Sequence, residues 1–121
     1  MIMKKNILRE KSFGFAVRIV NLFKYLCEKK KEFVLSKQIL RSGTSVGAMV
    51  RESEHAESKN DFVHKMAIAQ KEINETLYWL ELLNATKYIS TKEYESLCAD
   101  AVEIIKMITS SIKTAKRVVN G

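Results

Sequence analysis

The sequence of 121 residues contains no proline and only four glycines. A chain that folds back repeatedly in β-hairpins needs turn residues, and proline and glycine are among the commonest of them. Their scarcity therefore favours a few long helices over many short strands. A chain of this length can bury a sizeable hydrophobic core, so we expect a single domain over residues 1–121.

Long apolar runs are also missing. None approaches the roughly 18 residues of a membrane span. The opening MIMKKNILREKSFGF has charges among its apolar residues, where a signal peptide has an uninterrupted apolar region. The two cysteines, Cys27 and Cys98, lie in apolar helical stripes, as small buried hydrophobes do. These features predict a cytoplasmic protein with reduced thiols and no membrane contact.

Four segments with helical periodicity are present, and short polar connectors separate them. The helices are predicted to span residues 12–30, 36–57, 58–85 and 90–119. Ser36 is predicted to cap the second, and Ser58 and Ser90 stand at the starts of the last two. Short connectors make neighbouring helices antiparallel, so we predict an all-α, up-down-up-down four-helix bundle.

The first predicted helix carries more apolar surface than one bundle core can cover, since two adjacent stripes together span about 220°. One stripe consists of Phe13, Ala16, Val17, Val20, Phe23 and Cys27. The other consists of Phe15, Ile19, Leu22 and Leu26. We assign the second stripe to an interface between copies of the chain, which predicts a homo-oligomer. The alternative is that the basic N-terminal arm, residues 1–11, folds back over this stripe.

The net charge of +7 is unevenly distributed. Residues 1–37 hold ten Lys or Arg against three Asp or Glu, and the remaining residues hold eleven of each. The excess is either a solvated surface that maintains solubility or a patch for a polyanion, with RNA or DNA ahead of a membrane surface. The candidate nucleic-acid contacts are Lys4, Lys5, Arg9, Lys11, Lys29, Lys30 and Lys31. Few aromatic residues lie among them, so base stacking is not expected.

Two glycines, Gly43 and Gly47, lie inside the second predicted helix, where each costs about 1 kcal/mol relative to alanine. They share a side with Leu40, so we expect a neighbouring helix to approach closely there. Their spacing resembles the G-x-x-x-G packing motif of membrane helices, but the setting is polar. The lysine and the strand of a phosphate-binding loop are missing.

A polar stripe of Arg41, Ser45 and Glu52 runs beside the core stripe of the second helix, and Glu72 and Glu75 share one side of the third. An antiparallel arrangement predicts that Arg41 pairs with Glu75 or with Glu72. A structural ion pair is favoured. Two acids in one row can also act as an acid–base pair, but no nucleophile or oxyanion donor accompanies them.

Each of the two histidines follows an acid by three residues, in Glu52-x-x-His55 and Asp61-x-x-His64. Di-iron bundles use this spacing. Since the first and fourth helices offer no inward carboxylate at a matching level, solvated helix ends are the favoured interpretation. We predict no metal, no cofactor and no enzymatic activity.

The stretches QILRSGTSVGA (38–48) and ESKNDFVHKMAIAQKEINETLYWLELL (57–83) resemble a known bacterial family. Its members are four-helix-bundle proteins called 23S rRNA intervening sequence proteins, or S23-like proteins. The match is long and specific over the two middle helices and follows only the pattern of the outer two. The family typically has an asparagine where this chain has Met49, so no role of that side chain carries over.

This family is similar to the accessory variability determinant proteins of diversity-generating retroelements, basic homopentameric barrels that bind nucleic acid and a reverse transcriptase. The resemblance implies a ring-shaped homo-oligomer, with a pentamer favoured. It also implies a nucleic-acid-binding or adaptor protein that associates with ribosomal RNA or a ribonucleoprotein. The alternative is a protein–protein interaction or structural module without nucleic-acid contact, because a shared fold does not transfer function.

Overall fold

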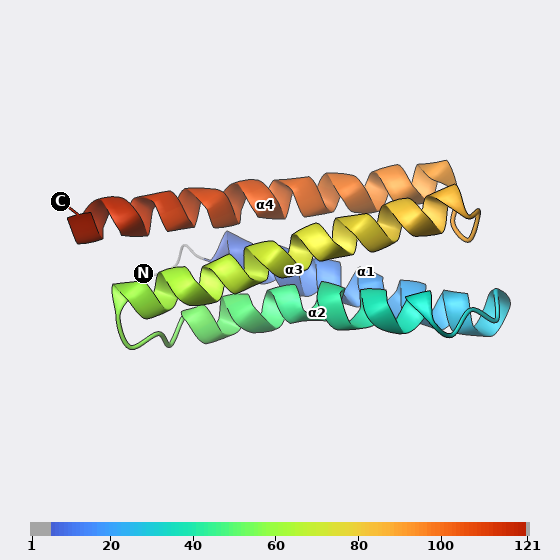
Figure 1. Cartoon of the computed structure of the whole chain (residues 1–121), viewed down its shortest axis with the longest axis horizontal. Helices are drawn as coiled ribbons and strands as arrows, with labels where there is room; N and C mark the ends of the chain where they lie inside the picture. The colour runs from blue at the N-terminus through green and yellow to red at the C-terminus, as the bar shows by residue number, and fades with distance from the viewer. Residues whose placement is uncertain (1–5, 121) are drawn as a thin grey trace.

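The computed structural model describes residues 6–120, and of residues 118–120 only the backbone. It contains four helices in the order α1 (Ile7–Lys29), α2 (Leu35–Ser53), α3 (Lys59–Ala85) and α4 (Thr91–Asn120), with no strand in the described range. The start of α1, the end of α4 and the α2–α3 turn lie together, and we call this the terminal end (Figure 1). The α1–α2 and α3–α4 connectors lie at the opposite, loop end. The predicted all-α, up-down-up-down bundle is confirmed.

Side-chain caps fix where three of the helices begin. Ser58 accepts a hydrogen bond from the Asp61 N–H at 3.0 Å, and Ser90 accepts one from the Glu93 N–H at 3.1 Å. Asn6 does the same for α1, so this helix begins five residues earlier than predicted. Residues 7–11, predicted as part of the basic N-terminal arm, therefore form the first turns of α1.

The α2 N-terminus is capped by Glu32, a residue that the sequence analysis missed. Its carboxylate accepts hydrogen bonds from the backbone N–H groups of Val34, Leu35 and Ser36, with N···O distances of 3.1, 2.9 and 2.7 Å. The side chain is almost fully buried, with 8% exposure. Burial alone would raise the pKa of Glu32, but the three backbone donors outweigh that effect and lower it. The predicted Ser36 cap is wrong: Ser36 lies buried within the helix.

The stripe of Phe15, Ile19, Leu22 and Leu26 lies in the core of the chain itself, with exposures of 0–5%. Our assignment of these residues to an oligomer interface is therefore wrong. The sequence shows two adjacent apolar stripes, but which of them faces inward depends on how the other helices dock. The neighbouring stripe is the more exposed one: Phe13 and Val17 retain 56% and 45% of their accessible surface, and its other four residues are half-buried.

The docking of α1 on α2 depends on the two glycines. A Cβ atom at Gly43 would lie 2.8 and 2.9 Å from the Cγ1 and Cγ2 atoms of Ile19. A Cβ atom at Gly47 would lie 3.2 Å from the carbonyl oxygen of Ser12. The predicted close approach is confirmed, and it turns the Ile19 face of α1 toward the core.

Candidate nucleic-acid interface

The basic residues predicted to contact nucleic acid separate into two groups in the structure, one at each end of α1. At the terminal end, Arg9 lies 3.7 Å from Glu54 and Lys11 lies 3.0 Å from Glu103. Lys4 and Lys5 fall outside the described residues. The positive charges described at this end are therefore partly neutralised by acids of α4 and the α2–α3 turn.

The other group of basic residues lies at the loop end. Lys29, Lys30 and Lys31 are exposed at the end of α1, Lys87 is exposed on the α3–α4 connector, and both segments lie at the loop end (Figure 1). Within residues 6–120, none of the four forms an ion pair. The backbones of Lys31 and Lys87 adopt positive φ angles of 54° and 68°, a region that favours glycine. Four exposed lysines thus lie at the loop end, and two of them, Lys30 and Lys87, line one groove there.

A groove of about 460 Å³ opens at this end between α1 and the α3–α4 connector, and we call it the loop-end groove. It is lined by Tyr25, Lys30, Asn84, Lys87, Tyr88, Ile89, Ser90 and Thr91. The Lys30 ammonium lies 5.9 Å from the centroid of the Tyr25 ring. Two tyrosines far apart in the sequence therefore flank two lysines in space. Few aromatic residues lie among the basic residues in the sequence, but the fold brings two tyrosines into this groove.

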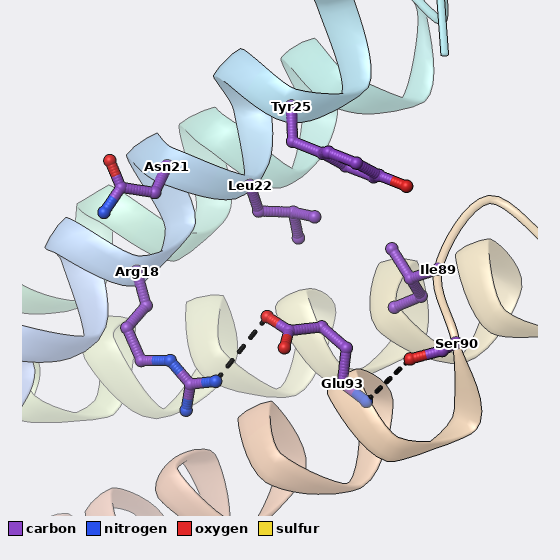
Figure 2. Close-up of a pocket in the computed structure, with 7 residues that line it drawn as sticks. All are labelled: Arg18, Asn21, Leu22, Tyr25, Ile89, Ser90 and Glu93. Carbon is purple, nitrogen blue, oxygen red and sulfur yellow. Dashed lines mark hydrogen bonds and ion pairs between the residues drawn. The ribbon is translucent and has the colours of Figure 1, made fainter. Parts of the chain in front are cut away.

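A second cavity of about 480 Å³ adjoins the loop-end groove and shares Tyr25, Ile89 and Ser90 with it. Figure 2 shows its walls: α1 supplies Arg18, Asn21, Leu22 and Tyr25, and the start of α4 with the preceding loop supplies Ile89, Ser90 and Glu93. The floor is apolar, because Leu22 and Ile89 are buried.

Arg18 links α1 to α4 beside this cavity through hydrogen bonds and ion pairs. Its guanidinium donates to the Asp100 carboxylate at 2.7 Å and to the Ser96 hydroxyl at 3.0 Å. It also lies 3.6 Å from the Glu93 carboxylate, which Figure 2 shows across the cavity. Arg18 thereby offsets the negative charge of Glu93, which lines the cavity next to the lysine-lined groove.

The second half of α4 carries a basic strip that the sequence analysis missed. Residues 104–121 contain no acid and four basic residues, which are Lys106, Lys113, Lys116 and Arg117. All four are exposed, and none forms an ion pair in the described part of the chain. The balanced count over residues 38–121 concealed the strip, because residues 38–103 are acidic; a running charge count would have revealed it.

The ion pair predicted for Arg41 is present, and it involves both acids. Arg41 Nη1 lies 3.1 Å from Glu72 Oε1, and Nη2 lies 2.5 Å from Glu75 Oε2. Arg41, and secondly the Trp79 indole N–H at 2.9 Å, lower the pKa of Glu75. This carboxylate therefore stays ionised at neutral pH, which does not suit it to deliver a proton.

The other polar residues of this stripe do not join the ion pair. The Ser45 hydroxyl donates to the Arg41 carbonyl oxygen at 2.6 Å, one turn earlier in the same helix. Glu52 is exposed, and its carboxylate forms no ion pair within residues 6–120. The predicted stripe thus divides into an α2–α3 ion pair and separate surface groups.

Both histidines are exposed near the α2–α3 turn. Across the described residues, no three His, Cys, Asp or Glu side chains come together in a way that would hold a metal ion. No helix in that part of the chain is long and apolar enough to cross a membrane.

The fold and the basic loop end together define a small helical-bundle protein whose distinctive surface is positively charged. The chain belongs to the 23S rRNA-intervening sequence protein family, whose model matches residues 4–110. The family assignment made from residues 38–48 and 57–83 is thereby confirmed.

A solved structure of the same kind supports this assignment. It is the 1.70 Å crystal structure of a protein of unknown function from the S23 ribosomal protein family of Bacteroides thetaiotaomicron VPI-5482. The two chains are 58% identical, with a TM-score of 0.88 over 88% of this chain and 99% of that one. Among curated proteins, no match was found. Neither comparison indicates an enzymatic family.

Proposed function

We propose that this protein is a non-enzymatic, cytoplasmic adaptor that binds nucleic acid through its loop end. The observation that carries the proposal is that Lys30 and Lys87, from two separate connectors, line one groove at the loop end, where Lys29 and Lys31 are also exposed. The name of the family refers to 23S rRNA, which makes RNA, and ribosomal RNA first, the partner to test.

The proposed mechanism is electrostatic. Lysines that neutralise phosphates release condensed counterions, and affinity then falls steeply as salt rises. Such contacts position a nucleic acid and carry little sequence information. We therefore expect binding that discriminates weakly among sequences.

Charge-removal variants test this proposal in a mobility-shift titration against an RNA hairpin and a DNA duplex at several salt concentrations. Lys30→Gln combined with Lys87→Gly removes two loop-end charges, and glycine suits the positive φ at residue 87. We expect about tenfold weaker binding at low salt, and a salt slope reduced by roughly one per lysine removed.

Arg9→Gln combined with Lys11→Gln is the matched control, because it removes two charges that acids already offset. This control should change the affinity less than twofold. The absence of binding at low salt, binding indifferent to salt, or equal losses in both double variants would each contradict the proposal.

We further propose that copies of the chain associate through the exposed stripe of α1. Phe13 and Val17 are solvent-exposed in the isolated chain, and Phe13 borders a shallow α1–α2 groove of about 260 Å³. Apolar side chains grouped along a helix typically mark an interaction surface. Association would multiply the lysine group by symmetry, and the family resemblance favours a ring of five.

Light scattering measures this association directly. The wild-type protein should have a mass that is a multiple of 13.9 kDa, and Phe13→Glu combined with Val17→Glu should return it to the monomer mass. Val102→Glu, which places the same charge at an exposed valine of α4, should leave the mass unchanged. A wild-type monomer at concentrations near 100 μM, or dissociation by the control alone, would contradict this interface.

One observation favours the alternative of a module that docks another protein. At the terminal end, Arg9 and Lys11 are paired with acids, and the exposed Phe13 lies close by on α1. A surface of paired charges around an aromatic side chain is typical of protein interfaces. Two results together would select this function. The wild-type protein would not bind nucleic acid, and it would form a stable complex with another protein that Phe13→Glu disrupts.

A further inference from the structure

We propose that the loop-end groove binds single-stranded nucleic acid, with an unpaired base against Tyr25 and the neighbouring phosphate between Lys30 and Lys87. The inference rests on the proposed function and adds two things to it: the form of nucleic acid and the residues that distinguish it. A surface of lysines alone would bind single strands and duplexes through the same phosphate contacts.

The aromatic part of the groove is suited to stacking. Tyr25 is 41% exposed on α1, so much of its ring is accessible. Tyr88, from the α3–α4 connector, lines the same groove and packs partly against the core, which limits its movement. Base–aromatic stacking is worth about 1–3 kcal/mol per base and tolerates any base.

The cationic part lies next to these rings. The Lys30 ammonium lies over the Tyr25 ring, 5.9 Å from its centroid, so a base that stacks on this face displaces the flexible lysine side chain toward the neighbouring phosphate. Lys87 lines the same groove from the α3–α4 connector. In the described range, no carboxylate lines this groove. A base and a phosphate thus have complementary groups within one cavity.

The backbone supports a functional role for Lys87. Its φ of 68° places it in the left-handed region, just after α3 ends. Glycine is the usual residue at that position of a helix C-terminus, and other residues cost about 1–2 kcal/mol there. A lysine in place of the favoured glycine contributes charge at the expense of stability, which is typical of a binding surface.

The available volume fits a short single strand. The loop-end groove of about 460 Å³ and the adjoining cavity of about 480 Å³ share Tyr25, Ile89 and Ser90. Ligand sites commonly measure roughly 300–1,000 Å³, so the loop-end groove has room for a stacked base. The adjoining cavity, where Arg18 offsets the charge of Glu93, has room for the next nucleotide. In a duplex the base faces are already stacked on one another and are not offered to a protein.

Fluorescence anisotropy with labelled oligonucleotides tests the inference. The probes are an eight-nucleotide oligouridylate and a twelve-base-pair RNA duplex, each titrated with wild-type protein and variants at fixed salt. Tyr25→Leu should weaken binding of oligouridylate about tenfold and change binding of the duplex less than twofold. Tyr25→Phe keeps the ring and should bind oligouridylate like wild type.

Tyr78→Leu is the matched control, because Tyr78 is similarly exposed but lies on α3 outside both cavities. It should leave both affinities unchanged, and thermal melting of every variant excludes loss of the fold as the cause.

The outcomes separate the inference from the proposed function. Equal effects of Tyr25→Leu on both probes, or none on oligouridylate, overturn the inference, while salt-dependent duplex binding still supports the proposed function. If wild-type protein binds neither probe, both fail.

Discussion

Gly43→Val is expected to lower the free energy of unfolding by about 3 kcal/mol, the upper end of the roughly 1–3 kcal/mol that overpacking a tight core typically costs. The first added carbon alone would lie 2.8 Å from Ile19 Cγ1 and 2.9 Å from Cγ2. Ile19 has no exposed surface and is branched at Cβ, so it cannot rotate away. Thermal melting should show a drop of roughly 10–15 °C.

Gly14→Val is the matched control for this prediction. Gly14 also lies inside a helix, but nothing comes within 4 Å of a Cβ built there. Valine has a higher helix propensity than glycine, so stability should change by less than about 0.5 kcal/mol. Combining Gly43→Val with Ile19→Ala should cost less than the sum of the two single changes, because the clash disappears. Additive losses would mean that Ile19 is not the obstructing side chain.

The α1–α2 contact shows both how far the sequence could predict the fold and where it could not. Gly43 and Gly47 are costly in a helix interior, so a close approach was predictable from their positions alone. Which stripe of α1 would face this contact was not predictable, because both stripes are apolar and lie side by side. The answer depends on where Ile19 and Ser12 meet the glycines, and this is a property of the docked pair.

The helix starts also divide into those that the sequence could predict and one that it could not. Ser58 and Ser90 precede acids at the spacing of a cap, and both caps are present in the structure. Glu32 was missed because it lies four residues before the predicted cap, Ser36, and its carboxylate reaches α2 only after the chain turns beyond Lys31. The positive φ of Lys31 makes that turn possible. A local pattern search does not include this geometry.

The candidate site was predictable in part. The run Lys29, Lys30, Lys31 is visible in the sequence, but Lys87 and Tyr88 join it only because the bundle places two connectors at one end. Conversely, Arg9 and Lys11 counted toward the predicted patch, yet they meet acids distant in sequence. Charge counted along the chain therefore overstated the unpaired positive charge at the terminal end and understated it at the loop end.

Glu32→Ala is expected to lower the free energy of unfolding by about 3 kcal/mol. Charge-assisted hydrogen bonds contribute roughly 1.5–3 kcal/mol each, and relief of the cost of burying the carboxylate offsets part of their loss. Three backbone N–H groups at the start of α2 donate to this carboxylate. Val34 offers no side-chain cap in its place. Denaturant unfolding measures the loss, and Glu28→Ala, which removes an exposed carboxylate near the end of α1, should change stability by less than about 0.5 kcal/mol.

Glu32→Gln separates the charge from the hydrogen bonds through its pH dependence. Folding lowers the pKa of Glu32, so the folded state binds its proton less readily than the unfolded chain. The stabilisation is therefore complete above the ordinary pKa of about 4.3 and is lost as the pH falls through the lower folded value. The stability advantage of wild type over Glu32→Gln should be constant from about pH 6 to 8 and shrink below about pH 4. If the stability difference between wild type and Glu32→Gln stays constant down to pH 2.5, the Glu32 side chain stabilises the fold through its shape and not through its charge.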